Sequence, residues 1–290
     1  MRDAIHRVRR FNRAVTSGVG ALDASFLGRG RPLGSVRVIN AIGQGRSDVA
    51  VLREYLGLET SLMSRLLRGL EDEGLVETLP HNDDGRRRVV RLTKAGKTEY
   101  RAYESLSNAQ AKAMLANHSK TNELLAAMDL VASVLGRERI TIEEADPRSG
   151  TASHCLDAYY AELSQRFELG FDVSRSRNPL AEQMIRPHGA FLIAMSDGLP
   201  IGCVGLKGVG AGLAEIKRLW VAPSARGLGL SKRLMESIED VARDLSVETL
   251  RLDTNRALPE AKNLYLKTGW KEIDRFNDDP YADWFFEKQL

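Results

Sequence analysis

Cysteine is scarce in this sequence, which contains only Cys155 and Cys203 among 290 residues. Two cysteines so far apart offer neither a disulfide framework nor the closely spaced ligands of a structural zinc site. Long apolar runs are also missing, since no stretch approaches the ~18 apolar residues that a membrane-spanning helix needs. Residues 1–11 are charged and lack the apolar centre of a secretory signal. We therefore expect no membrane span and a cytoplasmic location.

The charge is distributed unevenly along the chain, although the formal net charge is only +3. Residues 1–138 have 22 basic and 16 acidic side chains, whereas residues 139–290 have 20 basic and 23 acidic ones. A basic first half suits a polyanionic partner. No metal site is expected, because the five histidines are scattered along the chain. The length and the 43% hydrophobic content are typical of two globular domains.

Residues 214–235 predict a strand, a small-residue turn and a helix in succession. Ile216–Val221 is apolar and half-alternating, as in a strand, and two glycines, Gly227 and Gly229, precede the next element. That element repeats apolar residues at helical spacing: Leu230, Leu234, Ile238 and Val241. Glycines allow close approach of the backbone, and the first N–H groups of a helix attract anions. The stretch predicts a pyrophosphate site.

The first half is predicted to contain a helix-turn-helix. Helices are expected over 3–16 and 33–41, and on both sides of Gly57, with Asp48 as the cap of the first of this pair. The second helix of the pair is expected to bury four leucines: Leu62, Leu66, Leu67 and Leu70. Short polar and basic side chains are left on its other face: Thr60, Ser61, Ser64, Arg65 and Arg68. Such a helix can enter a DNA major groove.

A β-hairpin is predicted next, with strands over 75–79 and 87–92. Three consecutive arginines lie near its tip, at Arg86, Arg87 and Arg88. A cationic tip beside a recognition helix suits a contact with phosphate or the minor groove. Thr93 is expected to cap a helix over 94–117, and 121–135 is expected to form another.

Residues 3–136 resemble the MarR-type winged helix-turn-helix regulators. The matching segments are Leu52-x-x-x-Leu56-Gly57-Leu58, Leu70-x-x-x-Gly74-Leu75-Val76, Asp84-Gly85-Arg86-Arg87 and Leu92-Thr93-x-x-Gly96. The resemblance implies a homodimer in which the first and last helices of this half intertwine and two recognition helices read a near-palindromic DNA site. Glu59 departs from the usual serine at the start of the recognition helix. A winged fold that serves only for dimerisation is the alternative.

The second half predicts the order β-α-β-β-β-α-β-α-β over residues 139–290, with the glycine turn after the fourth strand. Arg226-x-x-Gly229-x-Ser231 resembles the acyl-coenzyme A loop of the GNAT N-acetyltransferases, with serine where the family usually has glycine or alanine. Leu264-Tyr265-x-Lys267-x-Gly269-Trp270 matches a second motif of the family. We therefore expect two domains: a mainly α winged helix-turn-helix over 1–138 and an α/β GNAT fold with a mixed, mostly antiparallel sheet over 139–290.

The GNAT resemblance implies a set of site residues. Acetyl-CoA would be bound by Leu219, Trp220, Val221, Arg226, Gly227, Leu228, Gly229, Leu230, Ser231, Asn255 and Asn263. Tyr265 would be the general acid for the departing thiolate, with a core tyrosine as the alternative. Glu215 is the candidate base, or else an exposed carboxylate at a strand end. Strict alternation would place Glu215, Lys217 and Leu219 on one face of the strand, and Ile216, Arg218 and Trp220 on the other.

These observations predict a bifunctional protein: a MarR-like DNA-binding homodimer joined to an acetyl-CoA-dependent N-acetyltransferase that acts on an amine. Asp253, Asn255 and the acidic, aromatic segment 277–283 are candidates for contact with the acceptor. The sequence leaves two alternatives open. In one, the winged half serves only for dimerisation; in the other, the second half only senses coenzyme A.

Overall fold

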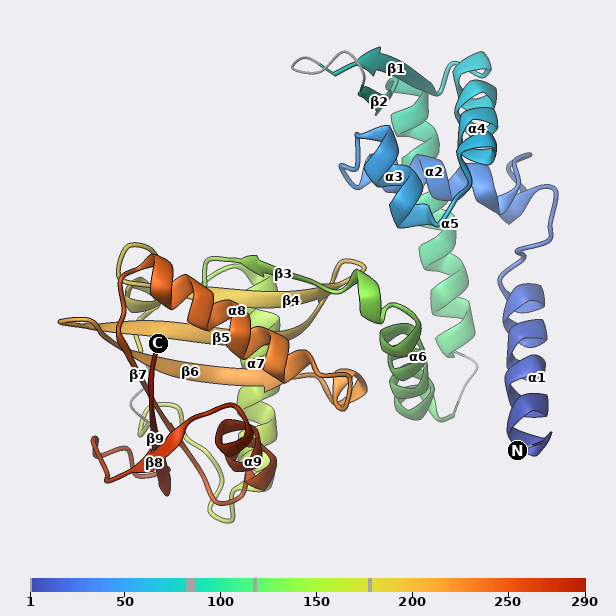
Figure 1. Ribbon diagram of the computed structural model, residues 1–290. Coiled ribbons are helices and arrows are strands. Elements are labelled where there is room, and N and C mark those ends of the chain that lie inside the picture. Colours follow the sequence, from blue (N-terminus) through green and yellow to red (C-terminus); the bar gives the residue numbers. More distant parts are fainter. Residues whose placement is uncertain (1, 82–86, 117–118, 177–178) are drawn as a thin grey trace. The chain divides into compact units, whose positions relative to one another are not determined.

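The computed structural model describes residues 2–81, 87–116, 119–176 and 179–290 (Figure 1). The chain divides into two compact units, residues 1–121 and residues 122–290. The helix over 121–135 is grouped with the second unit, so the boundary drawn here precedes the one expected at residue 138. None of the described helices is long and apolar enough to cross a membrane.

The first unit is helical apart from one antiparallel hairpin. In chain order its elements are α1 (Arg2–Gly18), the 3₁₀ turn η1 (Phe26–Gly28), α2 (Leu33–Gly43), α3 (Val49–Leu56), α4 (Thr60–Asp72), β1 (Val76–Pro80), β2 (Arg88–Leu92) and α5 (Lys94–Ala116). The core of this unit forms where α2, α3, α4 and α5 meet the hairpin, around Ile39, Leu52, Leu70 and Val90. The predicted winged helix-turn-helix is confirmed.

The helix boundaries of this unit follow from short-range capping. The side chain of Asp48 accepts hydrogen bonds from the backbone N–H groups of Ala50 and Val51, at 2.9 and 3.0 Å, which caps α3. Gly57 ends α3 with φ of 65°, a left-handed conformation that favours glycine. The N–H of Gly96 donates to the hydroxyl of Thr93 at 3.0 Å, which caps α5. All three features were predicted from the sequence.

The buried face of α4 differs in part from the predicted one. Met63, Leu67 and Leu70 are buried, whereas Leu62 and Leu66 are half-buried. Met63 joins Leu67 and Leu70 in the buried cluster, and Leu66 packs against it, so a flexible methionine takes a core position that the leucine pattern did not predict. The predicted polar face is nevertheless exposed.

The second unit is an α/β fold. In chain order its elements are α6 (Thr121–Leu135), η2 (Arg137–Arg139), β3 (Thr141–Glu144), α7 (Gly150–Arg166), η3 (Ala181–Met184), β4 (Gly189–Ser196), β5 (Leu199–Gly210), β6 (Leu213–Val221), η4 (Pro223–Ala225), α8 (Leu230–Asp244), β7 (Thr249–Thr254), α9 (Pro259–Lys267), β8 (Lys271–Ile273) and β9 (Trp284–Gln289). Its seven-stranded sheet has the order β3-β4-β5-β6-β7-β9-β8. All neighbours are antiparallel except β6 and β7, so the mixed, mostly antiparallel sheet is confirmed.

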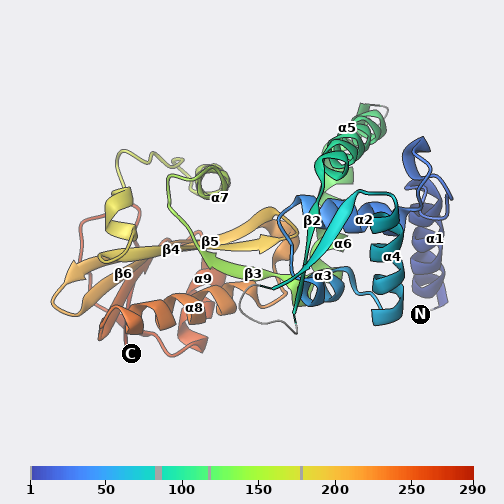
Figure 2. The same ribbon diagram turned by 90° about the horizontal axis from the view of Figure 1, so that it is seen from above.

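Helices cover both faces of this sheet. Seen on edge, α7 lies on one face and α8 on the other (Figure 2). Leu230, Leu234 and Ile238 of α8 belong to the larger buried cluster, and Ala152 and Cys155 of α7 belong to a separate one. Each face therefore has its own core, and the sheet separates the two.

A β-bulge in β6 overturns the strict alternation expected for this strand. The pairing with β5 shifts between Cys203 and Gly205, and Arg218 opposite this point has φ of 57°. Ile216 packs in the α8-side cluster, whereas Trp220 packs in the α7-side cluster. The predicted common face for Ile216, Arg218 and Trp220 is therefore wrong, because one extra residue reverses the alternation that follows it.

Candidate active site

The strands β6 and β7 diverge at the centre of the sheet. Their parallel pairing extends only from Leu213 opposite Thr249 to Glu215 opposite Arg251. Beyond this point β6 continues to Val221 and β7 continues to Thr254 without pairing to each other. The separation exposes the edge of β6, and it leaves space between the strands for a ligand.

The turn after β6 has the geometry of an anion site. Gly227 and Gly229 have φ of 76° and 80°, which L side chains rarely adopt. A Cβ at either glycine would meet no atom within 4 Å, so the space in front of both is open. Gly229 is also the N-terminal cap of α8, and no side chain caps this helix. The first N–H groups of α8 are therefore available to an anion.

A cleft of about 240 Å³ lies between this turn, α7 and α9. Seven of the residues predicted to bind coenzyme line it: Leu219, Trp220, Val221, Arg226, Gly227, Leu230 and Ser231. Its other walls come from α7 and α9, and include Tyr159, Glu162, Arg166, Glu260 and Leu264. The glycine turn and the end of β6 both line the cleft. This cavity is called the coenzyme cleft below.

Four further residues with the same predicted role lie outside this cleft. Leu228 is half-buried in the turn, and Gly229 caps α8 beside it. Asn255 lies at the end of β7, where its side-chain amide donates to the carbonyl of Tyr281 at 2.7 Å. Asn263 is exposed on α9 and lines neither of the two cavities described here. Coenzyme binding by all eleven residues stays a prediction.

Sequence reasoning missed a charged network on the wall of the coenzyme cleft. The carboxylate of Glu162 accepts hydrogen bonds from Arg226, from the indole N–H of Trp220 at 3.0 Å and from Arg166 at 3.1 Å. Arg166 also pairs with Glu260 of α9. Burial acts to raise the pKa of Glu162, but the hydrogen bonds and the positive charges outweigh it and lower the pKa overall. The network connects α7, the glycine turn and α9.

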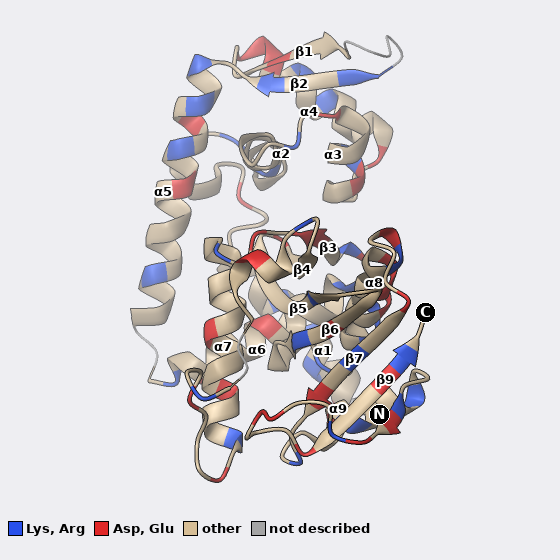
Figure 3. Cartoon of the chain, turned by 90° about the vertical axis from the view of Figure 1, so that its left-hand side faces the viewer, with Lys and Arg blue, Asp and Glu red and all other residues tan. Residues whose placement is uncertain are grey.

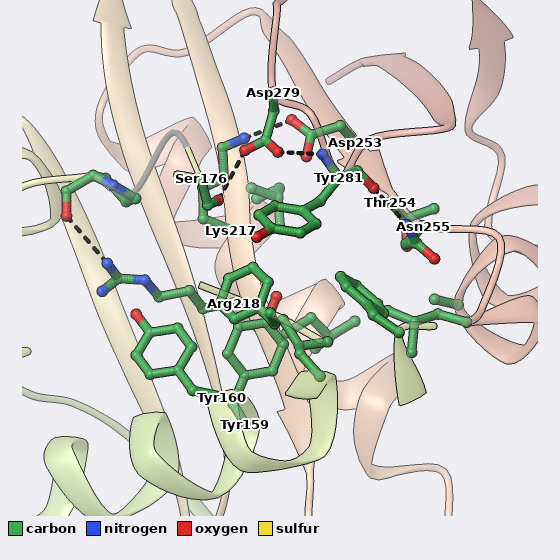
Figure 4. Close-up of a pocket in the computed structure, with 18 of the residues that line it drawn as sticks. Tyr159, Tyr160, Ser176, Lys217, Arg218, Asp253, Thr254, Asn255, Asp279 and Tyr281 are labelled. Carbon is green, nitrogen blue, oxygen red and sulfur yellow. Dashed lines mark hydrogen bonds and ion pairs between the residues drawn. The ribbon is translucent and has the colours of Figure 1, made fainter. Parts of the chain in front are cut away.

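A second cavity of about 110 Å³ lies beyond the separated strands (Figure 4). It draws side chains from distant segments, namely Tyr159 and Tyr160 of α7, Lys217 and Arg218 of β6, Asp253, Thr254 and Asn255 at the end of β7, and Asp279 and Tyr281 before β9. Tyr159, Leu163, Leu219, Leu258 and Ala261 line both this cavity and the coenzyme cleft. The two cavities therefore meet. This second space is called the acceptor cavity below, after the contact with the acceptor that the sequence predicts for Asp253 and Asn255.

A buried ion pair forms one wall of the acceptor cavity. The Nζ atom of Lys217 lies 2.6 Å from Oδ2 of Asp253 and 3.3 Å from Oε2 of Glu215. Burial acts to lower the pKa of Lys217, but Asp253 and Glu215 outweigh it and raise the pKa overall. The side chain of Asn277 donates to the same Asp253 oxygen at 2.8 Å. Lys217 is therefore a fixed ammonium group at the junction of β6 and β7.

The predicted DNA-binding side chains gather on one part of the first unit. Thr60, Ser61, Ser64, Arg65 and Arg68 are all exposed on α4. Arg88 is exposed at the start of β2, and further basic residues lie on β2 and along α5 (Figure 3). Arg87 pairs with Asp48, the α3 cap, at 2.6 Å. Arg86 lies outside the described residues.

Comparison with known proteins identifies both units. A family model described as the acetyltransferase (GNAT) family matches residues 156–270, and the MarR family model matches residues 30–87. A protein named IAA acetyltransferase from Azospirillum brasilense is 34% identical over 153 residues, which cover 51% of this chain and 88% of the relative. An uncharacterised N-acetyltransferase of Schizosaccharomyces pombe is 32% identical over 41% of this chain and 76% of the relative. The chain belongs to the GNAT acetyltransferase family.

It is a MarR–GNAT fusion, and its second unit is an acyltransferase that uses an acyl-coenzyme A. A GNAT acetyltransferase structure from Staphylococcus aureus is 20% identical, with a TM-score of 0.47, over 52% of this chain and 99% of that chain. The two family models confirm the predicted family membership of both halves.

Within the acetyltransferase domain, Tyr265 is the predicted general acid, and this role stays a prediction. It is buried on α9 and lines the acceptor cavity. Burial raises the pKa of its phenol, and the negative charge of Asp253 raises it further. The hydroxyl therefore stays protonated at neutral pH, as a proton donor must. The side chain also packs against Trp270 and Phe286, so it takes part in the core as well.

Glu215, the predicted base of the acetyltransferase, lies away from both cavities. Its carboxylate lies 3.6 Å from Lys207 and 3.3 Å from Lys217, and it lines neither cavity. Asp253, in contrast, lines the acceptor cavity, and it shares the ammonium group of Lys217 with Glu215. The role of Glu215 stays a prediction. The spacing of Glu215 and Lys217, two residues apart on one strand, is the sequence feature that indicates their ion pair.

Proposed function

We propose that the protein is bifunctional. Its first unit binds a near-palindromic DNA site as a homodimer, and its second unit transfers an acetyl group from acetyl-CoA to an amine. One observation carries the enzymatic part: an uncapped helix N-terminus with two left-handed glycines opens onto a cleft that meets a second, polar cavity. A pyrophosphate group fits the first of these features, and an amine acceptor fits the second.

The proposed chemistry takes place where the two cavities meet. An ammonium acceptor loses one proton to solvent, and the neutral amine then attacks the thioester carbonyl. A C–N bond forms and the C–S bond breaks, while a backbone N–H near Leu219–Val221 stabilises the oxyanion. Tyr265 donates its proton to the departing thiolate and regains one from the amide nitrogen. The products are the N-acetyl amine, coenzyme A and one proton.

Calorimetric titration with acetyl-CoA tests the coenzyme part of the proposal. Gly229→Asp places a negative charge and a strained side chain at the helix N-terminus, and we expect at least a hundredfold loss of affinity. Gly198→Asp is the matched control, since Gly198 has φ of 87°, also has open space around it and lies in the β4–β5 turn. Micromolar binding that survives the control but not Gly229→Asp supports the proposal. Absence of binding to the wild-type protein would refute it.

The exposed polar face of α4 supports the DNA-binding part. Selection from random-sequence duplex DNA, followed by anisotropy titration of the selected site, provides the measurement. Arg65→Ala with Arg68→Ala should weaken binding by at least tenfold and lower its salt dependence. The control is Arg137→Ala, an exposed arginine of the second unit. If the wild-type protein selects no sequence, the winged unit serves only for dimerisation.

An apolar stripe on α1 supports the proposed homodimer. Ile5, Val8, Phe11 and Val15 share one face and are 41–58% exposed. Such a stripe on an isolated helix calls for a partner surface. Val8→Glu with Phe11→Glu should convert the dimer to monomer in sedimentation velocity, whereas Arg7→Glu on another face of the helix should not. A wild-type monomer at micromolar concentration would contradict the dimer.

A further inference from the structure

The wall of the acceptor cavity is unusually rich in aromatic rings. Phe171 lies 4.9 Å from Tyr281, 5.8 Å from Phe167 and 5.8 Å from Tyr160, measured between ring centroids. All four rings are only half-buried, although they contact one another. Large apolar surface that stays accessible inside a cavity favours a ligand with a flat apolar group.

This aromatic wall is held in place from two sides. The hydroxyl of Tyr281 accepts a hydrogen bond from the backbone N–H of Asp172 at 3.0 Å, and its carbonyl accepts one from Asn255 at 2.7 Å. The loop after α7 and the loop before β9 are thereby joined across the cavity. The rings are therefore organised before any ligand arrives, which lowers the entropic cost of binding.

One cation of the cavity is placed there by the bulge. Arg218 is the bulged residue of β6, and its guanidinium lies 5.9 Å from the ring centroid of Tyr160. Its Nη2 donates to the carbonyl of Pro179 at 3.1 Å, which fixes the orientation of the planar group. A guanidinium has five N–H donors in a fork that matches a carboxylate. It also disfavours a second cation at this ring.

The negative charges of the cavity lie elsewhere. Asp253 is paired with Lys217, and Asp279 accepts hydrogen bonds from Ser176 at 2.8 Å and from the N–H of Tyr281 at 2.9 Å. Arg218 and Asp253 are well separated within the cavity (Figure 4). A ligand with both an amine and an acidic group can thus meet the opposite charge at each place.

We propose that the acetyl acceptor is a small aromatic amine that carries a carboxylate, of the aromatic amino acid class. The ring packs against Phe171 and Tyr281, the carboxylate pairs with Arg218, and the amine points to the junction with the coenzyme cleft. The transfer step is the one given above, with this amine as the nucleophile. The inference rests on the proposed acetyl transfer and specifies its substrate.

Release of coenzyme A is measured with L-phenylalanine, D-phenylalanine, alanine, phenethylamine and spermidine as acceptors. Alanine lacks the ring, phenethylamine lacks the carboxylate, and spermidine is a cation without either. For the better phenylalanine enantiomer we expect kcat/KM at least about tenfold above the values for alanine, phenethylamine and spermidine. A factor of this size corresponds to the contribution of one buried ring or one charged hydrogen bond. Equal or better use of alanine, phenethylamine or spermidine would overturn the inference.

Arg218→Gln sharpens this test. The variant should raise KM for phenylalanine by at least tenfold, with kcat changed less than threefold and KM for phenethylamine nearly unchanged. Arg175→Gln, at an exposed arginine of the nearby loop that does not line the cavity, is the matched control. An equal rise of KM for both acceptors would show that Arg218 does not bind a carboxylate.

Titration with acetyl-CoA separates the two ways to fail. If Arg218→Gln still binds acetyl-CoA like the wild type, its fold is intact and its KM values are meaningful. If the wild-type protein does not bind acetyl-CoA, the proposed enzymatic function itself is wrong. If it binds acetyl-CoA and acetylates amines without preference for an aromatic amino acid, only the present inference is wrong.

Discussion

The two cavities of the acetyltransferase domain are assembled in different ways. The coenzyme cleft takes its anion-binding part from one continuous stretch, residues 219–231, in which backbone groups and glycine conformations matter most. The acceptor cavity takes its side chains from segments more than 100 residues apart, such as Tyr160 and Tyr281. Backbone features of a short stretch can be read from a sequence, whereas a cavity built from scattered side chains exists only after folding.

The largest expected effect is that of a substitution at Tyr265, which should affect turnover and not the binding of acetyl-CoA. Tyr265→Phe should lower kcat by about 10²–10⁴-fold, because the departing thiolate loses its proton donor. The affinity for acetyl-CoA should change less than twofold, since Tyr265 lines the acceptor cavity and not the coenzyme cleft. Stopped-flow turnover and calorimetry provide the two numbers. An unchanged kcat would leave Tyr265 as a core residue.

The pH profile gives an independent check on the same residue. Burial raises the pKa of Tyr265 above its ordinary value, so the acid form persists to higher pH than it would for a free phenol. We expect no fall in wild-type kcat up to pH ~10, the ordinary pKa of a tyrosine. A fall of kcat between pH 7 and 9 that disappears in Tyr265→Phe would mean a lowered pKa and would contradict this assignment.

The next effect concerns stability at the wall of the acceptor cavity. Lys217→Met leaves the carboxylates of Asp253 and Glu215 buried without their shared ammonium, and we expect a loss of about 3–5 kcal/mol in the free energy of unfolding. Asp253→Asn in the Lys217→Met background should restore part of that loss. Urea unfolding of these two variants and of Asp253→Asn alone provides the measurement. Strict additivity of the two substitutions would show that the pair is not coupled.

A smaller effect should be confined to the winged unit. A Cβ on Gly96 would lie 1.9 Å from the carbonyl oxygen of Leu75, so Gly96→Ala forces α5 away from the residue that precedes β1. We expect a loss of about 1–3 kcal/mol for this unit and unchanged binding of acetyl-CoA. Gly69→Ala in α4 is the matched control, since a Cβ there meets nothing within 4 Å. Loss of acetyl-CoA binding in Gly96→Ala would show that the units do not fold independently.

The smallest effect is a pH-dependent change in the free energy of unfolding, caused by Asp48 and its ion pair with Arg87. Backbone hydrogen bonds from Val51, and next the side-chain hydrogen bond from Arg87, lower the pKa of Asp48. The contribution of Asp48 is therefore present above its unfolded pKa of ~3.9 and is lost as the pH falls through the folded value. Asp48→Asn keeps a capping side chain, so the loss at pH 7 should be only about 0.5 kcal/mol. Urea midpoints at pH 7 and pH 3 should show a smaller difference between Asp48→Asn and the wild type at the lower pH.

The elements that the sequence predicted well are governed by neighbours along the chain. Asp48, Gly57 and Thr93 mark helix ends because each acts on backbone groups within four residues. The glycine turn was predicted for the same reason. The predicted alternation of side chains along β6 was wrong beyond Arg218, because the bulge there depends on how β5 pairs with this strand. Met63 replaced a leucine in the α4 core because of packing against other helices.

The winged helix-turn-helix, the succession from β3 to α9 and the glycine turn could all be predicted from the amino-acid pattern, since capping, periodicity and glycine conformation act over a few residues. The predicted order has a single strand after α9, where the structure has β8 and β9. Which distant side chains meet depends on the tertiary fold. It joined Glu162 to Arg226 across 64 positions and placed Lys217 between Glu215 and Asp253. Contacts of this kind depend on the divergence of β6 and β7 and on the packing of α7. No local pattern in the chain encodes either feature.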